Sequence, residues 1–232
     1  MGNFYLMEIN YFTEMIEMAY QNYTSSRSEI HFSKKELQDL FLAMVVVTFA
    51  FAVALSNYGG FLNINWSAFP LALLISFLAV GSGFILHEMG HKFVAVRYGA
   101  WAEFRAWTQG LMMALMFALL TGFVFAAPGA VYIAGNITEE QNGKISIAGP
   151  LVNVIFALIF FPLSLIFSGL VINPILFQIV FYIYYINAFL AVFNLIPVMP
   201  LDGAKVQRWS TPIYVGILGI AIALLIPAFI LF

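Results

Sequence analysis

Long apolar runs alternate with short polar or glycine-rich stretches along most of this chain. A helix needs about 20 apolar residues to cross a bilayer, so runs of that length predict membrane-spanning helices. A shorter apolar stretch, Gly110 to Phe125, is followed by a polar loop from Asn136 to Lys144. The pattern predicts an all-α polytopic membrane protein with about five to six transmembrane segments. The long runs are Leu37 to Leu55, Ala68 to Val96, Ile145 to Phe167, Pro174 to Val198 and Pro212 to Leu231.

Composition agrees with a membrane protein and restricts its chemistry. Of 232 residues, 63% are hydrophobic and 9% are charged, whereas soluble domains have roughly 45–50% and about 25%. The chain has no cysteine, so any metal must be held by imidazole and carboxylate groups rather than thiolates. A net charge of −2 says nothing about nucleic acid. The sequence has no basic stripe interleaved with aromatic residues that would bind it, so we expect no nucleic-acid partner.

The N-terminal part differs in character from the rest. Met1 to Gln21 carries three glutamates instead of a basic end followed by an apolar core, which is not the pattern of a cleavable signal peptide. We expect an amphipathic segment over 1–36 and one transmembrane domain over 37–232, with its core at 68–208. Ser33 to Glu36 has the form of a helix-capping box.

The second apolar run contains His87-Glu88-Met89-Gly90-His91, an H-E-x-x-H motif. Ionisable groups cost free energy in hydrocarbon, so those placed in a span are functional candidates. On a helix, His87 and His91 project from the same face and can bind one metal ion, while Glu88 can address a water on that metal. This is the pattern of zinc peptide hydrolysis, with Glu88 as the catalytic base.

Two histidines leave such a site incomplete, because a catalytic zinc usually has three protein ligands and a water. Asp202 is the other carboxylate expected to lie against an apolar span. Counting about 1.5 Å per residue, His87 and Asp202 each lie at the far end of their span. We therefore predict one Zn²⁺ per chain, held by His87, His91 and Asp202.

The residues around Asp202 predict a break in the helix. Pro197 and Pro200 interrupt helical hydrogen bonding, and Gly203 permits a tight turn. Asn194 is expected to support this bend. The chain can then turn Asp202 inward, provided that protein or cavity water satisfies the freed backbone groups.

Charge and ligand depth together predict a topology. Lysine and arginine flank only one set of connections, and such residues concentrate on the cytosolic side. We expect a cytosolic N-terminus in a multi-pass protein of the cell membrane, with the site toward the cytosolic leaflet. His87 and Asp202 can share a metal only if a single crossing separates their spans, so Arg97 to Lys144 must start and finish on one side. We predict that Gly110 to Phe125 is a re-entrant hairpin with Thr121 and Gly122 near its tip; the alternative is an ordinary span followed by an extended return segment.

Three motifs in this order carry a family resemblance: His87 to His91, Ala148-Gly149-Pro150-Leu151-Val152-Asn153, and Asn194 to Pro197 leading to Leu201-Asp202-Gly203. The chain resembles the site-2 protease family of intramembrane zinc metalloproteases from about Leu74 to Lys205. The resemblance implies cleavage of transmembrane helices in membrane-anchored substrates. It also implies a role for Asn153 in holding substrate or the developing oxyanion. The chain departs from many relatives in its insertion near Gly110 to Phe125 and in having no inserted PDZ-like domain.

Two other functions remain open. A membrane metal transporter or metal-dependent receptor could place His and Asp ligands at depth without hydrolysing peptides, but it would not require Glu88 beside its first ligand. A zinc protease acting on soluble or prenylated substrates is the third possibility, although such enzymes usually take a glutamate from a later helix as third ligand. A strand edge on the predicted hairpin could hold an unwound substrate by β-addition.

Overall fold

The computed structural model describes residues 30–57, 63–124, 128–170 and 173–231. The amphipathic segment expected at the N-terminus falls mostly outside these residues.

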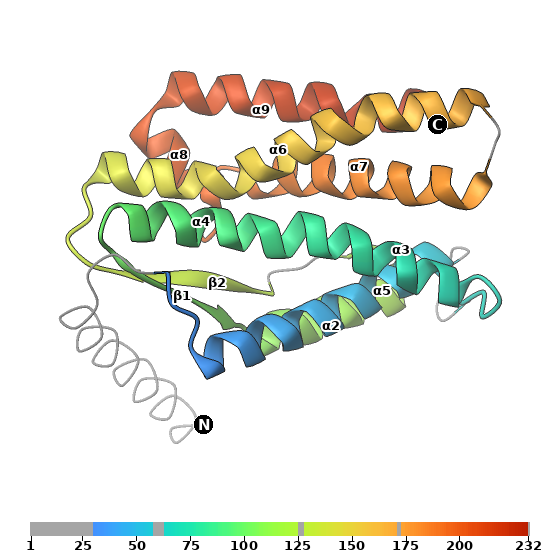
Figure 1. Ribbon diagram of the computed structural model, residues 1–232, viewed down its shortest axis with the longest axis horizontal. Coiled ribbons are helices and arrows are strands. Elements are labelled where there is room, and N and C mark those ends of the chain that lie inside the picture. The colour runs from blue at the N-terminus through green and yellow to red at the C-terminus, as the bar shows by residue number, and fades with distance from the viewer. Residues whose placement is uncertain (1–29, 58–62, 125–127, 171–172, 232) are drawn as a thin grey trace.

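Five helices in the described part of the chain are long and apolar enough to cross a membrane, as predicted. The second of them is continuous from Phe69 to Arg97 but contains one π-helical stretch. In Figure 1, α9 lies on the outer side of α6 and α7, and α2 lies on the opposite side of α4. The helices are α2 (Lys34–Ser56), α3 (Phe69–Val80) with η1 (Gly81–Ile85) and α4 (Leu86–Arg97), α6 (Glu139–Leu170), α7 (Pro174–Asn194), and α9 (Thr211–Leu225) with α10 (Pro227–Ile230). A short helix, α8 (Asp202–Trp209), precedes α9.

Two predicted helix ends were wrong. The polar residues after Thr138 were predicted as a loop, but α6 already begins at Glu139. The side chains of Thr138 and Gln141 each accept a hydrogen bond from the backbone N–H of the other. Glu140 forms an ion pair with Lys144 one turn later, so these polar residues cap and stabilise the first turns of α6. At the other boundary, α7 ends at Asn194 rather than Val198.

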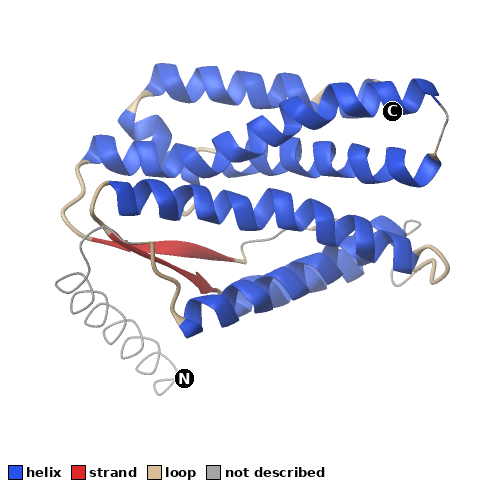
Figure 2. Cartoon of the chain, in the orientation of Figure 1, coloured by secondary structure: helices blue, strands red, loops and turns tan. Residues whose placement is uncertain are grey.

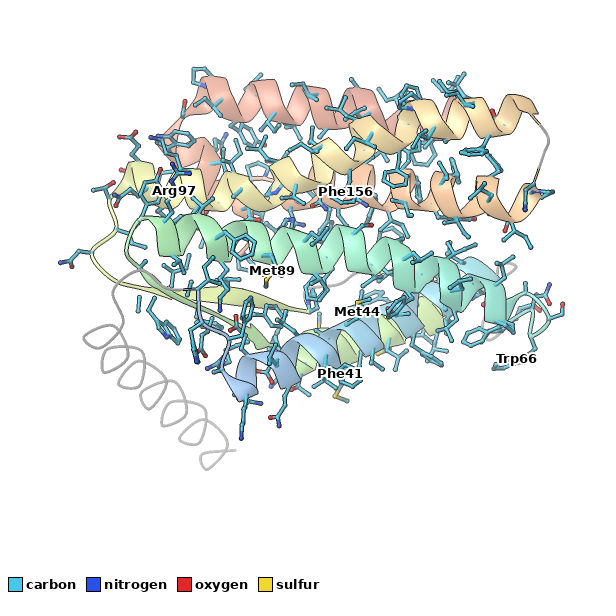
Figure 3. The ribbon with its side chains drawn as sticks, viewed as in Figure 1. Phe41, Met44, Trp66, Met89, Arg97 and Phe156 are labelled. Carbon is cyan, nitrogen blue, oxygen red and sulfur yellow. The ribbon has the colours of Figure 1, made fainter. Side chains whose placement is uncertain are left out.

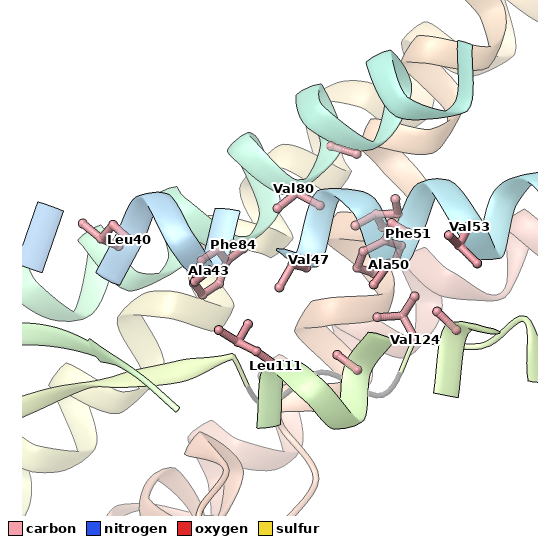
Figure 4. Close-up of a cluster of buried hydrophobic side chains, with 14 of the residues drawn as sticks. Leu40, Ala43, Val47, Ala50, Phe51, Val53, Val80, Phe84, Leu111 and Val124 are labelled. Carbon is pink, nitrogen blue, oxygen red and sulfur yellow. The ribbon is translucent and has the colours of Figure 1, made fainter. Parts of the chain in front are cut away.

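Apolar side chains occupy both the inside and the outside of this bundle, as a lipid-embedded protein requires. Phe41 and Trp66 are strongly exposed and lie toward opposite ends of the α2 side of the molecule (Figure 3). Inside, Val47 and Phe51 of α2 meet Val80, Phe84 and residues of α5 (Thr108–Thr121) in one buried cluster (Figure 4). Buried apolar contacts therefore tie α2 to the helix that carries the H-E-x-x-H motif.

The predicted hairpin starts and finishes at the same end of the bundle, but its construction differs from the prediction. It consists of strand β1 (Trp101–Ala106), helix α5 (Thr108–Thr121) and strand β2 (Gly129–Ala134), and the two strands pair antiparallel (Figure 2). The outward limb is thus helical, and strands form only at the base. Gly122, with a left-handed φ of 72°, turns the chain beside Asn57 at the end of α2, so the tip lies where it was predicted.

One of the lysines that the charge pattern places beside a span is buried. Lys92 follows His91 directly, and its ammonium group lies 2.6 Å from Glu36 with neither side chain exposed. Ser33 caps α2 by accepting the Glu36 N–H, but the Glu36 carboxylate bonds Lys92 and the Phe104 N–H instead of completing the capping box. The sequence analysis expected Asp202 to be the one carboxylate besides Glu88 against an apolar span. The structure differs, because Glu36 and Glu103 are buried as well.

Candidate metal centre and active site

The H-E-x-x-H motif lies on α4 directly after the π-helical stretch. His87 and His91 are one turn apart, both are buried, and their Nε2 atoms lie 3.0 Å from each other. A π-helical turn leaves backbone carbonyls without their usual partner, and such turns often occur at functional sites. Here the Gly83 carbonyl accepts a hydrogen bond from the Asn153 amide, which links this helix to α6.

Residues of α6 orient both imidazoles. The Nδ1 atom of His91 donates to the Ile145 carbonyl at 2.7 Å, and Nδ1 of His87 lies 2.6 Å from Oδ1 of Asn153. A proton held on Nδ1 by each of these oxygens leaves the Nε2 lone pair free. Both free lone pairs face the same point, which is how metal-binding histidines are fixed in proteins.

Asp202 closes the cluster from the start of α8. Its Oδ2 atom lies 3.3 Å from Nε2 of His87 and 3.1 Å from Nε2 of His91. Burial alone raises the pKa of the Asp202 carboxyl, but the positive charge and the hydrogen bonds of His91 and His87, when these carry a proton on Nε2, outweigh it and hold that pKa well below its usual range. A bound metal ion would replace those protons. The aspartate is therefore present as the carboxylate that a metal requires.

These three residues form a group that could hold a metal ion. The three facing atoms are 3.0–3.3 Å apart. Ligands about 2.0–2.1 Å from a tetrahedral zinc would lie roughly 3.3 Å from one another. The donor set of two imidazoles and one carboxylate, and its spacing, thus fit a three-ligand zinc site with one open position.

A break between α7 and α8 brings Asp202 to the histidines. Pro197 and Pro200 lie in the non-helical stretch that follows Asn194, as predicted, and Asn194 bonds back to the Leu190 carbonyl. Gly203 acts differently from the prediction, because it lies in α8 and does not form the turn. A Cβ there would lie 2.2 Å from the Leu195 carbonyl oxygen, so glycine lets the loop fold directly against α8.

Glu88 lies in the same pocket as the metal-ligand group. The pocket has a volume of about 130 Å³ and is lined by Glu88, His87, His91, Asp202 and residues of β2. Glu88 is buried, and its Oε2 atom has no hydrogen-bond partner among the described residues. Val131 of β2 lines the same pocket. A buried carboxylate oxygen without a partner, beside an open metal position, is suited to accept a proton from a water molecule.

Asn153 occupies a different position from the one its predicted role requires. It is fully buried, its carbonyl oxygen bonds His87, and its amide donates to the Gly83 carbonyl and to the Asn187 side chain. Both N–H groups are used, so in this arrangement neither is available to an oxyanion. The geometry favours a positioning role for Asn153 behind His87.

Two residues that the sequence analysis left without a role contribute to the site. Asn187 of α7 bonds Asn153, the Ser82 hydroxyl and the Ile183 carbonyl, so it fixes Asn153 in turn. Gly149 of α6 lies directly against the ligand atoms, since a Cβ there would lie 2.4 Å from Nε2 of His91. An asparagine or glycine inside an apolar span is a visible signal, but only the packing of α6 on α4 reveals what it contacts.

Comparison with known proteins gives two relatives, both from Methanocaldococcus jannaschii. "Putative zinc metalloprotease MJ0611" is 44% identical over 184 residues, which cover 79% of this chain and 88% of the relative. "Zinc metalloprotease MJ0392" is 28% identical over 173 residues, which cover 75% of this chain but only 41% of that relative. No family model and no solved structure matches the chain. The 44% identity across most of both sequences shows that this chain belongs to the zinc metalloprotease family of its Methanocaldococcus jannaschii relative.

Proposed function

We propose that this protein is an intramembrane zinc metalloprotease of the site-2 protease type, which hydrolyses peptide bonds in transmembrane segments of membrane-anchored substrates. The observation that carries the proposal is the position of Glu88. Its unpartnered carboxylate oxygen shares one buried pocket with His87, His91 and Asp202, and that pocket lies among helices long enough to cross a membrane.

The roles of the side chains follow from their positions. His87, His91 and Asp202 would hold the zinc ion. When bound, zinc acts as a Lewis acid on a peptide carbonyl and lowers the pKa of water toward about 7. Glu88 takes a proton from the attacking water and afterwards delivers it to the leaving amine. Asn153 keeps His87 in the tautomer that binds metal, as its 2.6 Å contact with Nδ1 indicates.

A substrate helix must unwind before it can be cut, because its carbonyls are hydrogen-bonded within the helix. The outer edge of β2 is suited to holding an unwound segment. Phe104 pairs with Val131, yet the Phe104 N–H points away from β2 to Glu36. Bonded and non-bonded pairs alternate in an antiparallel ladder, so the backbone groups of Gly129, Val131 and Ile133 point away from β1. These three residues line the pocket, where they can pair with an extended peptide.

The cytosolic N-terminus and the cell membrane remain part of this proposal. The clustering of lysine and arginine on one set of connections supports them. The pocket that holds the metal-ligand group would then lie toward the cytosolic leaflet, and water could reach Glu88 from the cytosol.

The decisive test is cleavage by purified protein in detergent. Wild type and Glu88→Gln are incubated with a panel of single-span substrates, and the metal content of both is measured. We expect wild type to cleave at least one substrate within its span. We expect Glu88→Gln to retain zinc and to lose on the order of 10²-fold or more in rate, the usual contribution of general-base catalysis.

The ligand variants complete this test. Zinc retained at wild-type stoichiometry after combined His87→Ala and Asp202→Ala substitution would contradict the ligand assignment. A zinc-loaded wild-type protein that cleaves no membrane-spanning substrate, or a Glu88→Gln variant as fast as wild type, would leave metal transport or metal sensing as the better function.

A further inference from the structure

A second, polar cavity adjoins the pocket that holds the metal-ligand group. It has a volume of about 490 Å³ and lies between the loop after β2, the start of α6 and one side of α8. Ile133 and Lys205 line both cavities. The polar cavity therefore adjoins the site near the C-terminal end of β2.

The charged groups of this cavity favour an anion. They are Lys205, Arg208 and Glu139, which give a net positive charge. Lys205 and Arg208 are three residues apart in α8 and so share one side of that helix. Lys205 lies 4.0 Å from Oδ1 of Asp202, at the outer limit of an ion pair, and Arg208 has no ion pair in the described part of the chain.

The strand edge of β2 determines which part of a substrate would reach the cavity. A peptide paired with β2 would place its scissile bond near Val131, which lines the same pocket as Glu88. Gly135, which lines the polar cavity, is four residues further along the chain. At about 3.3 Å per residue, the cavity begins roughly two to four residues from the scissile bond.

We propose that this cavity is a specificity subsite that binds a carboxylate of the substrate through Lys205 and Arg208. Its ligand is an acidic side chain about two to four residues from the scissile bond. This side chain belongs to the part of the substrate that extends past Ile133 toward the polar cavity. This subsite rests on the proposed proteolytic function. An anionic lipid headgroup has similar charge but no backbone to pair with β2, so the position of the cavity next to the end of that strand favours a peptide ligand.

The test measures binding and so does not depend on turnover. Full-length, zinc-loaded Glu88→Gln protein in neutral detergent is titrated with fluorescent apolar peptides that carry Glu, Gln or Lys at one flanking position. We expect the Glu peptide to bind about fivefold to tenfold more tightly than the Lys peptide, as for one or two partly exposed ion pairs. Raising the salt concentration reduces the difference.

Charge-reversal variants identify the residues responsible. Arg208→Glu, added to Glu88→Gln, abolishes or reverses the preference for the Glu peptide. Arg97→Glu is the matched control, because Arg97 is exposed at the end of α4 and does not line the polar cavity, so this variant keeps the preference. Lys205→Gln, with zinc content measured, weakens the preference as well.

Four outcomes would overturn the subsite. Equal binding of all peptides, or a preference that survives both Arg208→Glu and Lys205→Gln, removes the subsite and leaves the protease function standing. Phosphatidylglycerol is also added at constant ionic strength to protein that keeps Lys205 and Arg208. If it abolishes the preference for the Glu peptide, a lipid headgroup is the occupant of the cavity. Failure of every peptide to bind contradicts the proposed function itself, together with the subsite.

Discussion

The Nζ atom of Lys92 lies 2.6 Å from Oε2 of Glu36, and neither side chain is exposed to solvent. The same ammonium group donates to the His31 carbonyl, and Glu36 also accepts the backbone N–H of Phe104. One buried ion pair thus connects the first turn of α2, the residue after His91, and strand β1. Met89 of the motif helix also lies on the strand side of α4 (Figure 3), so the sheet is fixed to α4 by apolar and ionic contacts.

Removing one partner of this pair should destabilise the protein strongly. Lys92→Met leaves an uncompensated buried carboxylate, so we expect a loss of about 3–5 kcal/mol in the free energy of unfolding. Denaturant unfolding in detergent measures it. Lys144→Gln breaks the exposed pair with Glu140 and should cost about 1 kcal/mol or less. The combined variant Lys92→Met and Glu36→Leu should recover much of the lost free energy of unfolding. Equal losses in Lys92→Met, Lys144→Gln and the combined variant would show that burial adds nothing to the importance of this ion pair.

Gly149→Ala should disrupt the metal site without unfolding the bundle. A Cβ at this position would lie 2.4 Å from Nε2 of His91 and 2.6 Å from Nε2 of His87, the two atoms that face the metal position. We expect zinc content well below that of wild type in protein of unchanged helicity. Gly169→Ala in the same helix is the control, since nothing lies within 4 Å of its Cβ position. Normal zinc binding by Gly149→Ala would show that the site is wider than described.

Asn153→Ala distinguishes a positioning residue from an oxyanion donor. If Asn153 orients His87, its loss should weaken zinc affinity about 10- to 100-fold, as removal of such supporting hydrogen bonds usually does. Competition with a fluorescent chelator measures the affinity. Unchanged affinity combined with a large fall in kcat would favour the oxyanion role instead.

Proline at Ile133 tests the strand edge of β2. The Ile133 N–H points away from β1, so Ile133→Pro should remove a donor to substrate and leave the ladder between the strands intact. We expect slower cleavage of helical substrates at unchanged zinc content. Tyr132→Pro removes a donor inside the ladder and should destabilise the sheet itself. Wild-type cleavage by folded, zinc-loaded Ile133→Pro would mean that substrate is held elsewhere.

Topology can be measured with single cysteines, because the chain has none of its own. Cysteines placed at Arg97 and Asn142 should react with an impermeant reagent from the same side of the membrane, since β1 and β2 pair at the base of the hairpin. A cysteine at Asn173, beyond α6, should react from the other side. The positive charges predict that the shared side is cytosolic. Labelling of Arg97 and Asn142 from opposite sides would refute the hairpin and the ligand geometry built on it.

The sequence alone determined the helices and the ligand group. A bilayer requires about 20 apolar residues per crossing, so the length of each run predicts a spanning helix whatever its neighbours are. Likewise, residues four apart on a helix share a face, so the spacing of His87 and His91 already implies one metal. The common depth of His87 and Asp202 followed from counting residues, and the hairpin followed from that depth.

Only the tertiary structure decided what supports the site. Glu36 and Lys92 read as a capping residue and a surface cation, because local sequence does not show that α2 packs beside α4. The side-chain amide of Asn153 could contact either substrate or a histidine. Because α6 packs against α4, its oxygen contacts His87. A strand edge on the hairpin was expected, but its helical limb and the pairing of β2 with β1 were not. Each of these features depends on contacts between residues far apart in the chain, and the local pattern of apolar and polar positions does not encode such contacts.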